Sequence, residues 1–278
     1  MRIISFNANG IRSAANKGFF DWLKQQRADV VCLQETKAQE DQLSDPMFRP
    51  DGHHCFYKDA TTKKGYSGVA IYSRTEPDEV RTTLGWAPFD NEGRYLEVRY
   101  GKLSVVSMYV PSGSSGEERQ QFKFRAMKWL KPVLDQWLKS GRDYVLCGDW
   151  NIVRSRNDIR NWTSNQKNSG CLPAERAWLN GMIADACGDE TPAPKAAGWL
   201  DSFRVCKPDA VEYTWWSNRG AARANNVGWR IDYQIITPSL RQRVKACSIA
   251  ATPRFSDHAP YTVDYTDGTT RRAHTISP

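Results

Sequence analysis

The sequence lacks the patterns that mark membrane-spanning, secreted and repetitive proteins. Nowhere in its 278 residues do about eighteen apolar residues run together, and the start, Met-Arg-Ile-Ile-Ser-Phe, does not lead into the long apolar segment of a signal peptide. There is no repeat of solenoid spacing, no low-complexity tract and no Gly/Ser-rich or Pro-rich linker. We therefore expect a cytoplasmic protein of the bacterial type, without a membrane partner and with one folded domain.

Cysteine is sparse and irregularly spaced. The chain has 7 cysteines, an odd number, and no two of them have the Cys-x-x-Cys spacing of a zinc site or a redox motif. Disulfide frameworks belong to oxidising compartments and usually use an even number of cysteines. The pattern therefore favours a reducing compartment.

The sequence is rich in apolar residues and in positive charge. Hydrophobic residues make up 40% of the chain and aromatic residues 12%, which is enough to bury a large core and excludes disorder as the main state. Lysine and arginine total 39 against 31 aspartates and glutamates, so the net charge is +8. This charge favours a polyanionic partner.

The hydrophobic pattern predicts helices alternating with buried strands near both ends of the chain, and closely spaced strands between them. We expect helices at 19–26, 117–139, 173–184 and 199–205, the second with Pro132 as a source of a kink. We expect strands at 2–6, 30–33, 55–59, 67–73, 79–84, 95–100, 103–110, 144–147, 213–216, 226–236, 244–250 and 261–263. This order indicates an α/β fold.

The stretch Tyr-Val-Leu-Cys-Gly-Asp-Trp-Asn at 144–151 has the character of a buried strand that breaks at Gly148. A core strand has no packing reason to end in Asp149 and Asn151. Asp149 can accept or donate a proton, and the uncharged Asn151 can donate a hydrogen bond to an oxyanion. The alternative is a capped turn that leads into a polar loop, the usual role of a Gly-Asp sequence.

Further polar side chains gather at or near the ends of predicted strands, which favours the catalytic interpretation. Asp232 interrupts an apolar strand and can hold one ring nitrogen of His258, so that the other nitrogen serves as a base or contacts a phosphate. Asp257 is a hard oxygen ligand for Mg²⁺ or Mn²⁺. A cation site, an acid, a His-Asp pair and amide donors together suit a phosphodiesterase. The strand-end residues are Asn7, Glu35, Tyr109, Asp149, Asn151, Asp232, Asp257 and His258.

The segment 154–170 carries too many charges and amides to be part of a core. An aromatic residue, Trp162, lies among its basic side chains, a combination that suits contact with a nucleic-acid backbone. A solvated surface loop is the alternative, although loops of this length are often functional. The residues expected to contact a nucleic-acid backbone are Arg154, Arg156, Arg160, Lys167 and Asn168.

Six motifs, in this order, resemble those of the exonuclease III family of abasic-site DNA endonucleases. They are Ser5-Phe6-Asn7-Ala8-Asn9-Gly10, Leu33-Gln34-Glu35-Thr36, Tyr109-Val110-Pro111, Gly148-Asp149-Trp150-Asn151, Trp229-Arg230-Ile231-Asp232-Tyr233 and Ser256-Asp257-His258-Ala259-Pro260. The resemblance implies a single endonuclease/exonuclease/phosphatase-type catalytic domain at 1–265 and a tail at 266–278. It implies a DNase I-like, four-layered α/β sandwich of two packed, mostly antiparallel β-sheets flanked by helices.

The resemblance also implies a function. The protein would be a monomeric, Mg²⁺-dependent hydrolase of base excision repair that cleaves phosphodiester bonds 5′ to abasic sites, with Mn²⁺ as a substitute metal. It would add 3′-phosphodiesterase and 3′→5′ exonuclease activities. Its partner would be double-stranded DNA that contains abasic sites or blocked 3′ ends.

The site residues that the resemblance implies fall into three sets. The catalytic residues would be Tyr109, Asp149, Asn151, Asp232 and His258. The residues at the metal would be Asn7, Asn9, Glu35, Asp149, Asn151, Asp257 and His258. The pocket for a base-free sugar would be Trp215, Trp229 and Ile231, whose apolar wall would exclude a nucleotide that still carries its base.

A second family gives a rival function. The sequence around Trp162 and at 171–178 resembles the bacterial catabolite repression control proteins, which are non-catalytic, bind messenger RNA and help to repress translation. A protein that only binds has no need for Glu35, Asp149 and His258 together with Asn151 and Asp257. Because all five are present, the sequence favours the enzyme.

Overall fold

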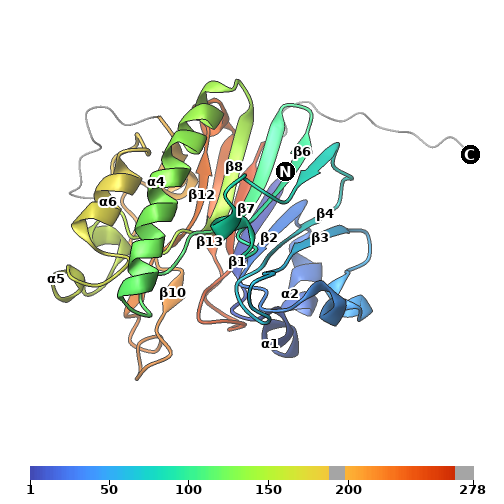
Figure 1. The fold of residues 1–278 in the computed structure, drawn as a ribbon, viewed down its shortest axis with the longest axis horizontal. Helices are drawn as coiled ribbons and strands as arrows, with labels where there is room; N and C mark the ends of the chain where they lie inside the picture. Colours follow the sequence, from blue (N-terminus) through green and yellow to red (C-terminus); the bar gives the residue numbers. More distant parts are fainter. Residues whose placement is uncertain (188–197, 267–278) are drawn as a thin grey trace, which may run out of the picture.

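The computed structural model describes residues 1–187 and 198–266. Two six-stranded β-sheets pack against each other, and helices cover their outer faces (Figure 1). Each sheet contains one parallel pair among antiparallel neighbours, which confirms the predicted sandwich of mostly antiparallel sheets flanked by helices. Among the described residues, no helix combines the length and the apolar character needed to cross a membrane.

The first sheet contains the N-terminal strand near its middle. Its order is β13 (Val244–Ile249), β14 (Tyr261–Tyr265), β1 (Arg2–Asn7), β2 (Val30–Gln34), β4 (Val69–Ser73) and β3 (His54–Lys58). Only β1 and β2 pair in parallel. The helices α1 (Ile11–Asn16) and α2 (Phe19–Gln26) pack on its outer face through residues such as Phe19 and Leu23.

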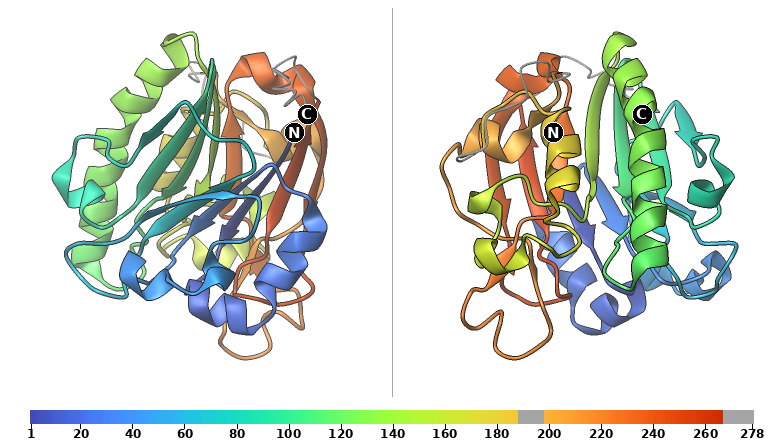
Figure 2. Two further views of the ribbon diagram at one scale, coloured as in Figure 1. Left: turned by 90° about the vertical axis from the view of Figure 1, so that its right-hand side faces the viewer. Right: turned by 60° about the vertical axis from the view of Figure 1, so that its left-hand side comes forward.

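The second sheet follows the same plan. Its order is β5 (Glu79–Arg81), β6 (Tyr95–Tyr100), β7 (Leu103–Tyr109), β8 (Asp143–Asp149), β12 (Asp232–Ile236) and β9 (Leu200–Asp201), with β7 and β8 parallel. The helices α4 (Glu117–Lys139) and α6 (Pro173–Asn180) lie outside it, as the turned views in Figure 2 show. The shorter elements are η1 (Glu40–Leu43), η2 (Pro46–Phe48), α3 (Ala87–Asp90), η3 (Arg156–Asp158), α5 (Trp162–Asn165), α7 (Ser202–Cys206), β10 (Trp215–Trp216), β11 (Gly228–Trp229) and η4 (Pro238–Arg243).

The central strands are buried on both faces, which explains their continuous apolar runs. Ile3 and Val145, from opposite sheets, are fully buried in the layer between the sheets. On the outer faces, Val31 packs with the residues under α1 and α2, and Leu146 packs with Leu130 of α4. Burial on both faces fixes where each strand lies and therefore where its polar end emerges.

The two parallel pairs bring the polar strand ends to one end of the sandwich. Asn7 ends β1 next to β2, and Tyr109 ends β7 opposite Asp149, the last residue of β8. A Cβ atom at Gly148 would lie 2.0 Å from the carbonyl oxygen of Met108, so glycine is required for β7 and β8 to approach this closely. The predicted break at Gly148 therefore coincides with a tight strand contact beside the polar ends.

Most predicted elements are present, and the differences have local causes. The single strand predicted at 226–236 is wrong: β11 ends at Trp229 and β12 begins at Asp232, because Arg230 turns inward and its N–H donates to the carbonyl oxygen of Asp158 at 2.7 Å. The helix predicted at 199–205 begins later, since Leu200–Asp201 form β9. Helix α4 continues through Pro132. The predicted tail at 266–278 lies outside the described residues after position 266.

A buried charge cluster holds the segment after β8 against β9, α7 and β12. Asp158 is fully buried, and its Oδ1 accepts hydrogen bonds from Arg230 Nε at 2.7 Å and Arg204 Nη2 at 2.6 Å. Arg230 also donates from Nη2 to Asp201 Oδ2 at 2.7 Å. Burial alone would raise the pKa of Asp158, but the two guanidinium groups hold it well below its usual range. The cluster therefore depends on an ionised Asp158.

Replacing Asp158 with asparagine should lower the free energy of unfolding by about 3 kcal/mol, because breaking a buried ion pair leaves its partner charges uncompensated. The folded pKa lies below the unfolded value, so the contribution of Asp158 is complete above about pH 4 and is lost as the pH falls through the folded pKa. Urea unfolding of wild type and Asp158→Asn between neutral and acidic pH measures this difference.

The matched control is Asp135→Asn, because Asp135 pairs with Lys131 on the surface of α4 with a third of its side chain exposed. That change should cost no more than about 0.5 kcal/mol. A loss for Asp158→Asn that equals the control, or that does not shrink toward acidic pH, would contradict the assignment.

Candidate active site

Two carboxylates, Glu35 and Asp149, share one amide donor at the end of the sandwich. The Nδ2 atom of Asn7 donates to Glu35 Oε1 and to Asp149 Oδ2, each at 2.8 Å. The Oδ1 atom of Asn7 accepts the backbone N–H of Asn9 at 2.9 Å. Since Asn7 ends β1 and Asp149 ends β8, this buried amide links the two sheets at the site.

His258 stands between two carboxylates. Its Nδ1 atom lies 2.8 Å from Asp232 Oδ2, and its Nε2 atom lies 3.8 Å from Asp149 Oδ2. Asp232 and Asp149 face each other across β12 and β8. The His-Asp pair predicted from the sequence is confirmed, and it orients the ring so that Nε2 faces Asp149.

Burial and charge shift the protonation of these groups in different directions. Burial raises the pKa of Asp149 to about 8, with help from Asp232 and opposition from His258. Burial lowers the pKa of His258, but the neighbouring carboxylates outweigh it and raise the pKa to about 10. Burial also raises the pKa of Glu35, but the Lys37 ammonium and the Asn7 amide hold it below its usual value. Near neutral pH the site therefore holds a cationic imidazole, an anionic Glu35 and an Asp149 that can exchange a proton.

Tyr109 ends β7 beside the carboxylate pair. The guanidinium carbon of Arg94 lies 4.5 Å from the centre of its ring, and Arg94 Nη1 donates to the Tyr109 carbonyl oxygen at 3.0 Å. Burial and the charge on Glu35 raise the pKa of the Tyr109 hydroxyl well above its usual value. The hydroxyl therefore stays protonated and can donate a hydrogen bond. No pattern in the sequence indicates that Arg94 supports this ring.

A second polar group lies beside the carboxylate pair. Asp257 Oδ1 accepts from Asn9 Nδ2 at 2.8 Å, and Asp257 Oδ2 accepts from Trp215 Nε1 at 3.1 Å. Lys37 connects the two groups, because its Nζ lies 2.7 Å from Glu35 Oε2 and also donates to Asn9 Oδ1. Lys37 was missed from the sequence, although its place two residues after Glu35 was an available signal.

Four residues of the site have left-handed backbone conformations. The φ angles are 45° at Asn9, 49° at Glu35, 49° at Lys37 and 53° at Asn151. Such conformations cost of order 1 kcal/mol or more for residues with side chains, and they persist where surrounding contacts impose them. Their concentration in the loops that follow β1, β2 and β8 is typical of a functional site.

A buried ion pair that the sequence analysis missed fixes Asn151. Lys123 and Glu175 are fully buried and lie 2.6 Å apart, and Lys123 Nζ donates to the Asn151 carbonyl oxygen at 2.8 Å. The Asn151 Nδ2 atom donates to the carbonyl oxygen of Val110 at 2.9 Å. A lysine on the buried face of α4, seven residues before Leu130, was the available signal.

The three residues predicted to form a sugar pocket lie together next to His258. Trp215 and Trp229 meet edge to face, with ring centres 5.8 Å apart, and Ile231 packs in the same apolar cluster. The Trp215 ring centre lies 6.4 Å from that of His258. An apolar wall therefore borders the polar site.

Three of the predicted metal ligands form a group that can hold a metal ion. Glu35, Asp149 and His258 each bring a ligand atom within 4.8 Å of the others. The two carboxylates suit a hard divalent cation, and the ionised state of Glu35 provides charge for it. His258 can be a ligand only when its ring has lost a proton. Of the other predicted ligands, Asn7 and Asn151 contact Asp149, while Asn9 and Asp257 contact each other beside the group.

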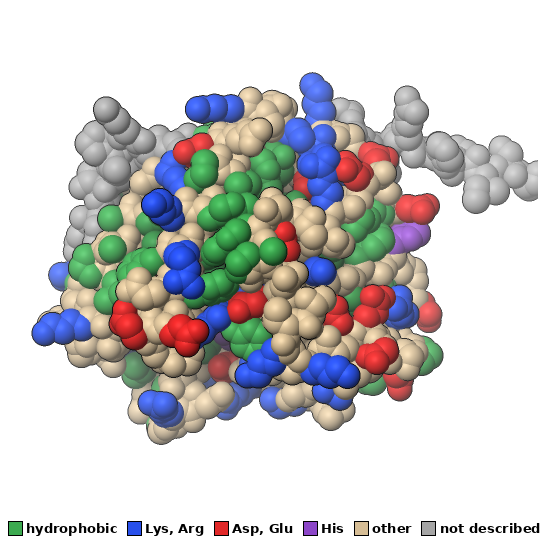
Figure 3. Space-filling view, in the orientation of Figure 1, with side chains coloured by type: hydrophobic (Ala, Val, Ile, Leu, Met, Phe, Trp, Pro, Cys, Tyr) green, Lys and Arg blue, Asp and Glu red, His purple; other side chains and the backbone are tan. Residues whose placement is uncertain are grey.

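The predicted DNA-backbone residues divide into buried and exposed ones. Arg154 is 1% exposed, and its guanidinium is bound to Asn180 and Asp185. The prediction that Arg154 contacts DNA is therefore wrong, because its guanidinium is buried and pairs with Asp185 inside the protein. The exposed members are Arg156, Arg160, Lys167 and Asn168. In Figure 3, lysine and arginine side chains are spread over the face shown, from its upper edge to its lower edge.

Comparisons with known proteins agree with this geometry. The model of the endonuclease/exonuclease/phosphatase family matches residues 4–258. The chain is 35% identical to an exodeoxyribonuclease of Bacillus subtilis, over 94% of this chain and 97% of that protein. It is 34% identical to the DNA repair nuclease APEX1 of Danio rerio, over 95% of this chain and 81% of that protein.

A solved structure is similar along nearly the whole chain. It is the 3′ phosphatase NExo from Neisseria bound to a product DNA hairpin, with a TM-score of 0.82, 25% identity, and coverage of 95% of this chain and 99% of that one. Together with the bridged carboxylates and the His-Asp pair, these matches establish that the chain belongs to the endonuclease/exonuclease/phosphatase family.

Proposed function

We propose that the protein is a DNA repair nuclease that hydrolyses the phosphodiester bond 5′ to an abasic site and also acts on blocked 3′ ends, with 3′→5′ exonuclease activity. The observation that carries the proposal is the joint position of Asp149, Glu35 and the His258–Asp232 pair beside an apolar wall. Relatives that match nearly the whole chain are named as an exodeoxyribonuclease and a DNA repair nuclease.

Asp149 exchanges a proton with the attacking water. Its Oδ1 accepts the backbone N–H of Asn151 at 2.8 Å and its Oδ2 accepts from Asn7, so the carboxylate has a fixed orientation. Burial raises its pKa to about 8 in the metal-free protein, so this carboxylate holds a proton more readily than an ordinary aspartate. A positioned group of this kind can accept a proton from water and return it to a leaving oxygen.

Three hydrogen-bond donors surround the place where a phosphate would lie. The Nε2 of a protonated His258 points toward Asp149, and Asp232 stabilises its charge. Tyr109 offers a hydroxyl that stays protonated, and Asn151 offers an amide whose plane is fixed by Val110. Donors held in place before the reaction stabilise the charge that develops on phosphate oxygens.

The cation is Mg²⁺ in this proposal, with Mn²⁺ as a substitute. Glu35 would hold it together with Asp149, and Asn7, Asn9 and Asp257 would complete its surroundings. A bound divalent cation would neutralise phosphate charge and stabilise the leaving oxygen.

Selection for damage would follow from the apolar wall. Trp215, Trp229 and Ile231 belong to one apolar cluster, and the Trp215 ring lies next to His258. A nucleotide that kept its base would have to fit that base into this space. A base-free sugar has no base to place there, so the apolar wall would exclude only the bulkier nucleotide that keeps its base. All the groups named here belong to one chain, so we propose that a monomer suffices.

RNA-binding regulation is the weaker alternative. A binding protein gains nothing from a buried carboxylate pair held together by an amide, since such groups cost stability. The relatives named above are nucleases, and the site keeps the groups that nuclease chemistry requires.

The first prediction concerns Asp149→Asn, which keeps the size of the side chain but removes the proton acceptor. Single-turnover cleavage of an abasic duplex should fall by roughly 10²- to 10⁴-fold, while binding of the duplex persists. Burial raises the pKa of Asp149 to about 8 in the folded protein, above the value of about 4 in the unfolded chain. The ionised carboxylate therefore destabilises the folded state increasingly as the pH rises from about 4 to 8. Without metal, the variant should be at least as stable as wild type near neutral pH. A variant that cleaves normally would remove Asp149 from the mechanism.

A second prediction concerns Glu35→Gln, which removes charge from the cation group. The Mg²⁺ concentration for half-maximal cleavage should rise by at least about tenfold, and excess metal should restore part of the rate. The control is Glu40→Gln, because Glu40 is exposed in η1 and pairs with Arg49. Equal metal dependence in both variants and wild type would show that Glu35 does not serve the cation.

A third prediction separates stability from catalysis at Lys123. The change Lys123→Met should lower the free energy of unfolding by about 3 kcal/mol, since it removes the cation that Glu175 pairs with in the interior. The double variant Lys123→Met/Glu175→Gln should recover most of that stability. Its single-turnover rate should stay at least about tenfold low, because the Asn151 carbonyl has lost its donor.

The control on the same helix is Lys131→Met, because Lys131 is a third exposed and pairs with Asp135. It should change neither stability nor rate appreciably. A double variant that cleaves at the wild-type rate would show that Lys123 serves only the fold.

A further inference from the structure

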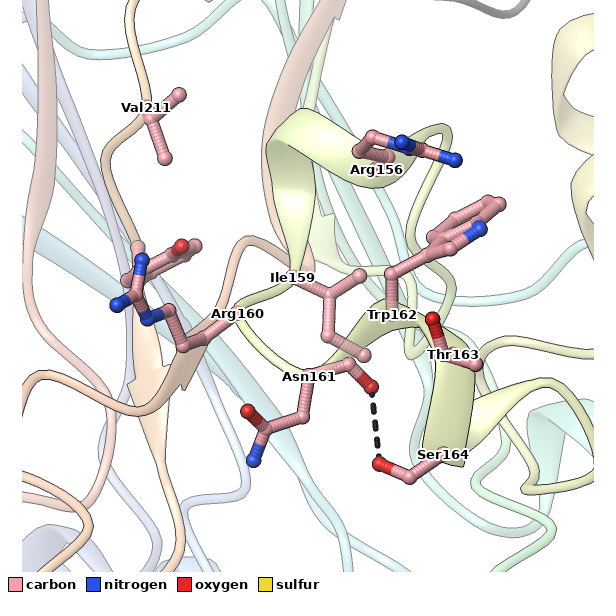
Figure 4. Close-up of a pocket in the computed structure, with 9 residues that line it drawn as sticks. Arg156, Ile159, Arg160, Asn161, Trp162, Thr163, Ser164 and Val211 are labelled. Carbon is pink, nitrogen blue, oxygen red and sulfur yellow. Dashed lines mark hydrogen bonds between the residues drawn. The ribbon is translucent and has the colours of Figure 1, made fainter.

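A groove lies on the far side of the short β10–β11 ribbon from His258. We define it by Arg156, Ile159, Arg160, Trp162, Val211 and Tyr213, and it has a volume of about 540 Å³. Figure 4 shows Arg156 and Trp162 on one side, Arg160 and Val211 on the other, and Asn161 and Ser164 at the lower end. The volume falls within the roughly 300–1,000 Å³ of small-ligand pockets.

The groove combines cationic and apolar walls. Arg156 and Arg160 are exposed and supply positive charge, whereas Trp162, Val211 and Tyr213 supply aromatic and apolar surface. None of the described residues that line the groove is acidic. A ligand that fits these walls carries a phosphate and a flat ring, which is the chemistry of a nucleotide.

The floor of the groove is held rigidly. Asp158 in η3, between Arg156 and Arg160, is fixed by the buried arginine cluster and accepts the backbone N–H of Arg154 at 3.2 Å. The guanidinium of Arg176 lies over the Trp162 ring at 4.5 Å and restricts it. A preformed site loses less entropy when a ligand binds.

The groove is joined to the catalytic site through the backbone. Ile159 forms a β-bridge with Trp229 of the sugar-pocket wall, and the N–H of Arg160 donates to the carbonyl oxygen of Gly228 at 3.0 Å. Tyr213 lies two residues before Trp215, which contacts His258 and Asp257. The groove and His258 therefore border the same short ribbon, one on the side of Trp229 and the other on the side of Trp215.

We propose that this groove binds one unpaired nucleotide of the DNA beyond the incision site, with its base on Trp162 and its phosphate between Arg156 and Arg160. Bases in a duplex are stacked and paired, so only an unpaired nucleotide can present its ring to the groove. The groove would thus favour substrates with a single-stranded tail, as at a frayed or resected end. The proposal rests on the function proposed above.

The experiment measures binding in EDTA, where cleavage does not interfere. Three fluorescein-labelled probes are compared by anisotropy. They are a blunt duplex with one tetrahydrofuran abasic analogue, the same duplex with a single-stranded thymidine tail at the 3′ end, and the same duplex with that tail at the 5′ end. Wild type should bind a tailed duplex more tightly than the blunt one. Trp162→Ala should weaken tailed binding by about tenfold and leave blunt binding nearly unchanged. Arg160→Ala should also weaken tailed binding by about tenfold, and it should weaken blunt binding much less.

Two control variants show whether the tail preference depends on an aromatic face at position 162, and whether it depends on the place of the lost arginine or only on the loss of one positive charge. Trp162→Phe keeps an aromatic face and should retain most of the tail preference. Arg81→Ala removes one exposed arginine from β5, at the far edge of the second sheet, and should weaken binding of all three probes equally and slightly. If neither tail tightens wild-type binding, or if Arg160→Ala acts no more strongly than Arg81→Ala, the proposal is overturned. The proposed function is tested by a different measurement, and it fails if the wild-type protein does not cut the blunt abasic duplex in Mg²⁺.

Discussion

The site depends on one buried amide. Asn7 joins Glu35 to Asp149 with two hydrogen bonds of 2.8 Å, and in doing so it ties the end of β1 in one sheet to the end of β8 in the other. Like charges this close in a buried place repel each other, and burial adds to the cost of each. The positive charges of His258 and Lys37 offset that cost. These groups meet because the packed core between the two sheets holds the ends of β1 and β8 next to each other.

The same constraint explains the chemistry. A carboxylate that is surrounded by other carboxylates and by little water holds its proton more tightly, which brings the pKa of Asp149 to about 8. Burial lowers the pKa of His258, but the Asp232 carboxylate raises it as well and keeps that ring protonated and positively charged. Two neighbouring groups thus act in different ways near neutral pH, one exchanging a proton and the other supplying a positive charge. Two further contacts hold neighbouring residues of the site in place. Lys123, paired with Glu175, donates to the Asn151 carbonyl oxygen, and Arg94 stacks on the Tyr109 ring.

Much of this arrangement could be predicted from the sequence. Strands that are buried on both faces have continuous apolar runs, so the polar residues at their ends stand out in the sequence. Six motifs in order then indicated the kind of sandwich in which these strand ends meet. The His258–Asp232 pair followed from an aspartate in an otherwise apolar strand. These predictions succeeded because each relied on a local pattern whose meaning does not depend on distant residues.

The parts that failed depend on distant partners. Arg154 looks like a surface residue in the sequence, yet Asn180 and Asp185 hold it in the interior, and no local pattern announces those contacts. The break between β11 and β12 has the same origin, since Arg230 leaves the strand to reach Asp158 some seventy residues earlier. Lys123 was overlooked because a lysine in a long helix is usually solvated. Charges are hard to place from sequence, because whether they are buried is decided by partners elsewhere in the chain.

The central claim is that the carboxylates and the His-Asp pair form a working nuclease centre and not the remains of one. The most direct test is a gel assay of wild-type protein with a duplex that carries one tetrahydrofuran abasic analogue, in Mg²⁺ and in EDTA. We expect a single cut on the 5′ side of the lesion in Mg²⁺, leaving a 3′-hydroxyl end, and no cut in EDTA. An intact duplex in Mg²⁺ would contradict the account, the more so if the same protein bound RNA tightly.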